Sequence, residues 1–188
     1  MQPLARLPAQ VVIVAGFRGG VGHAAPGVQV ELAHARLDGV ARLGHGRQLR
    51  LQPLDLALAL QDALDRIAAD ESARVVVLAG AGKAFCAGHD LKQMKEDTSL
   101  DTYRALFAQC AKLMLTIQRM PQPVIARVHG VATAAGCQLV GTCDLAVAVE
   151  GARFGVSGIN VGLFCTTPGV ALARNVGRKE AFEMLVTG

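Results

Sequence analysis

The sequence of 188 residues has no tryptophan, a single tyrosine and six phenylalanines. A hydrophobic core must therefore be built mainly from leucine, valine and alanine, and the 52% of hydrophobic residues is enough to build one. The sequence also lacks long runs of basic residues and long runs of apolar residues. Its 19 lysines and arginines are scattered, which argues against nucleic-acid binding, and no apolar run reaches the roughly 18 residues of a membrane span. The chain is typical of a globular protein, and its length predicts one domain.

The five cysteines include no C-x-x-C pair and lie among apolar or very small residues. This pattern favours reduced, buried thiols in an intracellular protein over disulfides, and we expect no metal site. The N-terminal part has neither the apolar region and cleavage site of a secretory signal nor the serine-rich composition of a transit peptide. The predicted location is the cytoplasm, with the mitochondrial matrix as the alternative.

Residues 1–53 differ in composition from the rest of the chain. The first 70 residues contain no serine, threonine, asparagine or lysine, and arginine, alanine, glycine, leucine and valine dominate them. Val11 to Ala15 predict a strand that leads toward a glycine-rich loop, Gly19 to Gly22. A nucleotide phosphate loop needs lysine and then serine or threonine after the last glycine, but His23 and Ala24 stand there. A glycine-rich turn is favoured, and nucleotide binding through Gly19 to Gly22 remains a remote alternative.

From residue 54 the apolar periodicity becomes regular. It predicts strands over 74–80, 124–126 and 145–149, and helices over 56–67, 91–95, 137–142, 168–173 and 180–186. Another helix is predicted from an apolar and aromatic stripe that is more typical of a core than of a cofactor site: Tyr103, Leu106, Phe107, Cys110, Leu113, Met114 and Ile117. Because strands and helices alternate, the pattern favours parallel strands in an α/β fold.

Two segments place very small residues just before a helix. The first leads from the strand over 74–80 to Asp90, a predicted N-cap, and the second is a loop over 130–136. Unpaired backbone N–H groups at a helix start carry the positive end of the helix dipole, so they can hold an oxygen that acquires negative charge. Small residues also permit close helix packing, and these residues alone leave both interpretations open.

Together the two segments resemble the enoyl-CoA hydratase/isomerase (crotonase) family. Residues 84–91 are similar to its A-F-x-A-G-x-D-[LI] signature, and residues 130–148 to its G-x-x-x-G-G-G-x-x-L…C-D-[LI]-x-x-A signature. The resemblance implies an α/β, crotonase-like (ClpP/crotonase) spiral of ββα units, here incomplete at both ends. We expect residues 1–53 to be an atypical Arg/Gly/Ala-rich segment, and residues 54–188 to be the core without the family's C-terminal helices. Absence of those helices is expected to expose apolar surface.

The resemblance also implies a binding site. In this family two backbone N–H groups polarise a thioester carbonyl and stabilise an enolate, and by position they belong to His89 and Ala135. The implied substrate-binding residues are Cys86, Ala87, Gly88, His89, Asp90, Leu91, Ala134, Ala135 and Gly136. The substrate would be a coenzyme A thioester, either acyl-CoA or enoyl-CoA, with no permanently bound cofactor. The family's usual assembly is a homotrimer or hexamer.

The two glutamates that hydratases of this family use are replaced, by position, with Gln138 and Gly158. Glutamine cannot take up a proton at neutral pH and glycine has no side chain, so ordinary hydration is not expected. Any turnover would need His89, Ser157 or Cys165 as a substitute base. The sequence therefore predicts acyl-CoA binding and enolate stabilisation, and the alternative is a non-catalytic acyl-CoA-binding or regulatory protein of the same fold.

Overall fold

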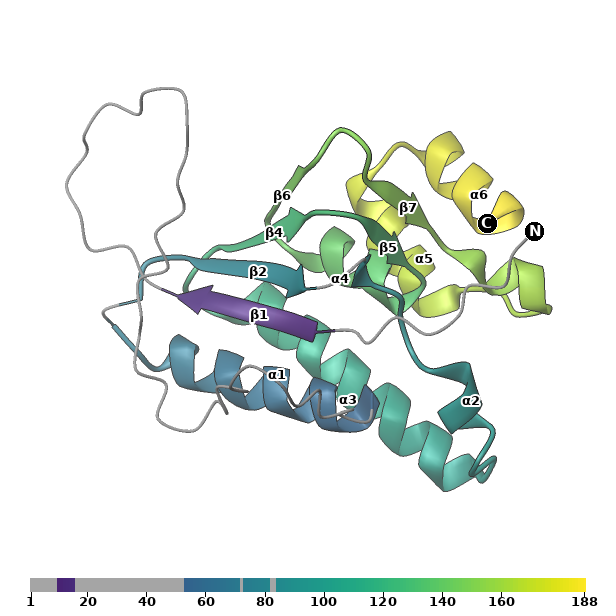
Figure 1. The fold of residues 1–188 in the computed structure, drawn as a ribbon, viewed down its shortest axis with the longest axis horizontal. Helices are drawn as coiled ribbons and strands as arrows, with labels where there is room; N and C mark the ends of the chain where they lie inside the picture. Colours follow the sequence, from purple (N-terminus) through teal and green to yellow (C-terminus); the bar gives the residue numbers. More distant parts are fainter. Residues whose placement is uncertain (1–9, 16–52, 72, 82–83) are drawn as a thin grey trace.

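The structure is a computed structural model that describes residues 10–15, 53–71, 73–81 and 84–188 (Figure 1). In these residues the chain forms two sheets with helices packed around them. The glycine-rich loop Gly19 to Gly22, with its remote nucleotide-binding hypothesis, lies outside the described residues. The strand expected before it is present as β1 (Gln10–Ala15). No helix in the described part of the chain is long and apolar enough to cross a bilayer.

The larger sheet has the order β1-β2-β4-β6. Strand β1 runs antiparallel to β2 (Val76–Ala81), whereas β2, β4 (Val124–Val128) and β6 (Leu145–Ala148) are mutually parallel. Asp144 fixes one end of this sheet, because its Oδ2 accepts the Val124 N–H at 2.7 Å while its own N–H donates to the Val124 carbonyl at 2.9 Å. The aspartate of the C-D signature therefore has a structural role.

The smaller sheet consists of three parallel strands in the order β3-β5-β7. They are β3 (Ala84–Cys86), β5 (Val131–Thr133) and β7 (Arg153–Gly155). Each strand of the small sheet directly follows one of the large sheet, and a helix comes next, so the chain repeats a ββα unit. The helices of successive units are α2 (Leu91–Met94) with α3 (Leu100–Arg119), then α4 (Ala135–Thr142), then α5 (Thr166–Asn175) with α6 (Arg178–Thr187).

Two boundaries near the second signature differ from the sequence prediction. The expected loop over 130–136 contains strand β5, and α4 begins at Ala135 rather than at Cys137. Strand β5 is only three residues long and is held by pairing with β3 and β7, which a local pattern does not reveal. Helix α5 likewise begins at Thr166, before Pro168, because proline is tolerated in the first turn of a helix.

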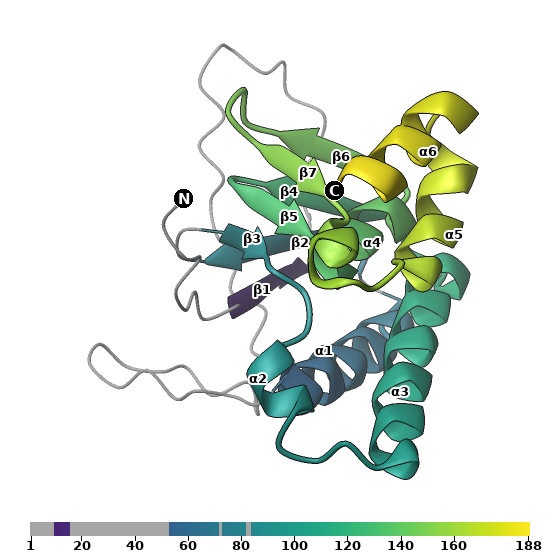
Figure 2. The same ribbon diagram turned by 90° about the vertical axis from the view of Figure 1, so that its right-hand side faces the viewer.

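The main core lies between the large sheet and the pair formed by α1 (Pro53–Ala68) and α3 (Figure 2). Its fully buried side chains come from α1, α3 and the strands, and include Leu64, Val76, Leu78, Phe85, Ile117, Val124 and Val128. Most of the predicted stripe on α3 is buried as expected: Leu106, Cys110, Leu113, Met114 and Ile117. Phe107 was wrongly placed in that core, because it is 43% exposed and contacts His89 instead.

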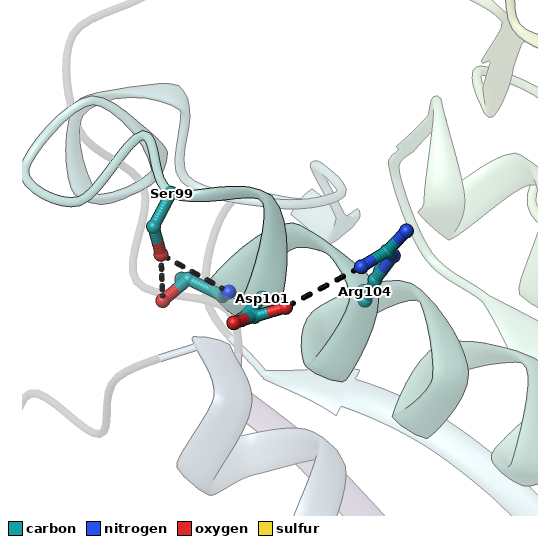
Figure 3. A network of polar contacts seen from close by, with 4 residues as sticks. Ser99, Asp101 and Arg104 are labelled. Carbon is teal, nitrogen blue, oxygen red and sulfur yellow. Dashed lines mark hydrogen bonds and ion pairs between the residues drawn. The ribbon is translucent and has the colours of Figure 1, made fainter.

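The polar segment before α3 forms the cap of that helix (Figure 3). The Ser99 side chain accepts the Thr102 N–H at 3.2 Å, and Asp97 accepts from the Ser99 N–H at 2.8 Å. One turn further on, Arg104 and Asp101 form an exposed ion pair at 3.5 Å. The Tyr103 hydroxyl donates to the Met94 carbonyl at 3.0 Å and so joins the start of α3 to α2.

Strand β6 lies at the edge of the large sheet and exposes apolar side chains. Leu145 is 61% exposed and Val147 is 63% exposed. Phe182 on α6 is 64% exposed as well. Apolar surface of the kind expected from the sequence is thus present on the described residues.

Candidate functional site

The two small-residue segments singled out in the sequence lie directly against each other. An ideal Cβ at Gly136 would be 2.1 Å from the Cys86 carbonyl oxygen, and one at Gly88 would be 3.1 Å from the Ala135 backbone nitrogen. Gly88 also has φ +86°, which side chains rarely adopt. Only glycine fits at these two positions, and the absence of side chains lets the segment after β3 pack onto the start of α4.

Ala134 makes a sharp turn between β5 and α4. Its φ of 52° is the one positive value among the non-glycine residues that the structure describes, and its N–H donates to the Gly155 carbonyl at 3.0 Å. Such a conformation costs on the order of 1–3 kcal/mol and tends to occur at functional sites. It makes Ala135 the first residue of α4, where the backbone N–H has no acceptor within the helix.

His89 stands between Gly88 and the residue that caps α2. The expected cap is confirmed, because Asp90 Oδ1 accepts the Lys92 N–H at 2.8 Å. The His89 ring packs edge-on against Phe107 of α3, with the ring centroids 6.0 Å apart and an angle of 85° between the planes. Burial lowers the pKa of the His89 imidazole, so the ring is neutral at pH 7.

The other predicted substrate-binding residues of the first signature differ in how far they are buried. Cys86 is half-buried, and burial raises the pKa of its thiol although the Gly88 N–H acts in the opposite direction. Ala87 is exposed, and Leu91 on α2 is 46% exposed. The first signature thus presents its backbone to α4 and some of its side chains to solvent.

Neither of the two positions that the resemblance assigns to the family's glutamates carries an ionisable side chain. Gln138 in α4 is buried, and its Oε1 has no hydrogen-bond partner among the residues that the structure describes. Gly158 lies in a 3₁₀ turn, η1 (Ser157–Val161). An ideal Cβ there would be 2.6 Å from Cys165 Sγ and 2.8 Å from the Leu163 carbonyl oxygen. The Cys165 side chain and the Leu163 backbone therefore leave no room for a side chain at position 158.

A pair of hydroxyl groups next to these positions was not foreseen as a pair. Thr133 Oγ1 and Ser157 Oγ are 3.0 Å apart and join the end of β5 to the start of η1. Ser157 was a candidate base from its place in the sequence, whereas Thr133 was not. Their approach depends on the β5–β7 register, in which Thr133 lies opposite Gly155, and that register could not be read from the sequence.

The thiols near the site are poorly suited to act as bases. Cys165 donates a hydrogen bond to the Val156 carbonyl at 3.4 Å and packs with the buried Cys137. Burial raises the pKa of Cys137, the Gly155 backbone N–H lowers it in part, and nearby Cys165 raises it further. Across the described ranges, no group of three or more histidine, cysteine or acidic residues is arranged to hold a metal ion.

Repeated ββα units and two apposed small-residue segments define a crotonase-like protein. The sequence profile described as "Enoyl-CoA hydratase/isomerase" matches residues 54–188, most of the chain. The chain therefore belongs to the enoyl-CoA hydratase/isomerase family, and the expected fold is confirmed.

Within the family, the chain is similar to "Enoyl-CoA hydratase domain-containing protein 3, mitochondrial" of Xenopus laevis, with 47% identity over 146 residues. That alignment covers 78% of this chain and 50% of the relative. Among solved structures, an enoyl-CoA hydratase of Mycobacterium smegmatis shows 69% identity and a TM-score of 0.70, covering 71% of this chain and 52% of the other. The human enoyl-CoA hydratase domain-containing protein 3 shows 48% identity and a TM-score of 0.69, and the match covers 72% of this chain and 53% of the other. The chain spans about half the length of the relatives it matches.

Proposed function

We propose that this chain binds acyl-CoA or enoyl-CoA thioesters and holds the thioester carbonyl oxygen with the backbone N–H groups of His89 and Ala135. The observation that carries the proposal is the contact between the two segments, in which an ideal Cβ at Gly88 would be 3.1 Å from the Ala135 nitrogen. Two N–H groups aimed at one carbonyl oxygen would polarise the carbonyl and stabilise the enolate formed when a proton leaves the neighbouring carbon.

The binding site would need little from its side chains. The two donors are main-chain N–H groups, so a histidine at position 89 and an alanine at position 135 can both provide them. The formal net charge of +4 suits the phosphates of coenzyme A. No permanently bound cofactor is proposed, because the thioester itself is the ligand.

A second candidate function is acyl-CoA binding without turnover, and the packing around Gly158 favours it. Hydration requires one group that activates water and one that delivers a proton. Gln138 cannot ionise near neutral pH, and Cys165 with Leu163 fills the space that a side chain at 158 would occupy. The neutral imidazole of His89 is the remaining candidate for a base, and it is held on Phe107.

Calorimetric titration with butyryl-CoA and crotonyl-CoA, together with loss of enoyl absorbance, tests both functions. We expect saturable binding of both thioesters and no hydration of crotonyl-CoA. Replacing Ala135 with proline removes the proposed N–H donor at the first helical position and should weaken binding about tenfold or more. Hydration that Gln138→Ala leaves intact but His89→Gln abolishes would favour an enzyme with a displaced base. Absence of thioester binding would refute the proposed function.

Location and assembly are also proposals. We propose the cytoplasm, with the mitochondrial matrix as the alternative, which the word "mitochondrial" in the names of the frog and human relatives favours. The homotrimer or hexamer typical of the family is the proposed assembly, and the exposed apolar side chains of β6 are compatible with a contact surface.

A further inference from the structure

The hydroxyl pair of Thr133 and Ser157 has hydrogen-bonding capacity that its internal contact does not use. The two Oγ atoms are 3.0 Å apart, and both residues are half-buried rather than sealed in the core. Two hydroxyls carry two protons, and the bond between them uses only one. The pair therefore offers one further O–H donor and several lone pairs on adjacent atoms.

The pair lies close to the proposed thioester site. Thr133 precedes Ala135 by two residues, which limits the separation of their Cα atoms to about 7 Å. Ser157 directly precedes Gly158, the position of the second usual glutamate. The Ala134 N–H bond to the Gly155 carbonyl, at 3.0 Å, fixes the segment of Thr133 against the segment of Ser157. The hydroxyls are thus within reach of the first few carbons of an acyl chain whose carbonyl is held at Ala135.

The chemistry of the pair suits recognition of a hydroxyl group. A bound hydroxyl needs an acceptor for its proton and a donor for its oxygen, and the pair provides both on neighbouring atoms. Neutral hydroxyls do not take up protons at neutral pH, so the pair cannot replace the missing carboxylates as a base. With no side chain at 158 and a neutral one at 138, nothing ionised from these positions competes for the ligand.

We propose that Thr133 and Ser157 are specificity-determining residues that bind a hydroxyl group on the acyl chain, so that the site prefers a hydroxylated acyl thioester to a plain one. This inference rests on the proposed function, because it assumes that the thioester carbonyl is held at Ala135. Loss of either hydroxyl should remove the preference while plain thioesters still bind.

The test is the ratio of two dissociation constants measured on the full chain by calorimetry. We compare butyryl-CoA with each enantiomer of 3-hydroxybutyryl-CoA in the unmodified protein and in Thr133→Val and Ser157→Ala. One added hydrogen bond should give the unmodified protein an about 3- to 10-fold preference for one hydroxylated enantiomer. In both variants the ratio should fall close to one, with butyryl-CoA affinity unchanged within about twofold.

Two further variants separate recognition from general damage. Thr133→Ser keeps the hydroxyl and should keep the preference. Thr187→Val is the matched control: it removes an exposed hydroxyl that bonds only the Glu183 carbonyl in its own helix, and it should also keep the preference. A misfolded variant would lose both ligands equally, which the butyryl-CoA affinity itself detects. Equal affinities in the unmodified protein, or a preference that survives in both Thr133→Val and Ser157→Ala, would overturn the inference. Failure of both thioesters to bind would instead overturn the proposed function.

Discussion

Two alanine substitutions in the same helix should change stability in opposite directions. Gly136→Ala and Gly141→Ala add the same methyl group to α4, five residues apart. At Gly141 the new Cβ would meet Ala171 Cβ at 3.5 Å, an ordinary van der Waals contact. Replacing a helical glycine with alanine should stabilise the fold there by about 0.5–1 kcal/mol.

At Gly136 the same added methyl group overlaps with the backbone of Cys86 at the end of β3. The new Cβ would be 2.1 Å from the carbonyl oxygen and 2.7 Å from the carbonyl carbon of Cys86. Relieving that overlap displaces β3 from β5, and such overpacking costs about 1–3 kcal/mol or more. The helical preference of alanine offsets at most about 1 kcal/mol of this cost. The net effect should be destabilising, and the site should open.

Urea unfolding of both variants beside the unmodified protein provides the measurement. The midpoint should rise for Gly141→Ala and fall for Gly136→Ala, with similar slopes. Butyryl-CoA titration should show binding retained in Gly141→Ala and lost or strongly weakened in Gly136→Ala. If Gly136→Ala were as stable as the unmodified protein and bound the thioester equally well, the close approach of the two segments would be refuted.

Three further changes test separate parts of the structure. Ser99→Ala should cost about 0.5–2 kcal/mol through loss of the α3 cap, whereas Arg104→Ala should cost less than about 0.5, as unfolding midpoints will show. Gly158→Glu should lower the melting temperature and restore no hydration of crotonyl-CoA, while Gly151→Glu, where a Cβ meets nothing within 4 Å, should leave the melting temperature nearly unchanged. Burial lowers the folded-state pKa of His89. The neutral imidazole's contribution to folding stability is therefore fully present above the unfolded-state pKa of about 6.5, and it is lost as pH falls through the folded-state pKa. His89→Gln should therefore flatten the loss of stability below pH 6.5, and an unchanged pH profile would contradict this.

The sequence was sufficient to locate the elements of the site and to indicate which two segments meet, but not the strand pairing and side-chain contacts around them. Apolar periodicity predicted most helices and strands, and the two signatures predicted which segments would meet. The Asp90 cap was also predictable, since capping depends on neighbours in the chain. All of these features are local or are carried by motifs.

Features that depend on strand register were missed. Strand β5 is too short to show alternation, and it exists because β3 and β7 pair with it. The Thr133–Ser157 contact follows from the same pairing. Phe107 has helical spacing typical of a core residue, but it is 43% exposed and its ring contacts His89. The closed space around Gly158 depends on the path of residues 163–165, which no signature describes.

The central claim is that the N–H groups of residues 89 and 135 share one thioester oxygen. Isotope-edited infrared spectroscopy of butyryl-CoA labelled with ¹³C at the carbonyl measures this directly, because two hydrogen bonds weaken the C=O bond. We expect the carbonyl band to move to lower wavenumber on binding, and to move back part of the way in Ala135→Pro. A bound thioester whose carbonyl band stays at its position in water, or is unaffected by Ala135→Pro, would contradict the claim.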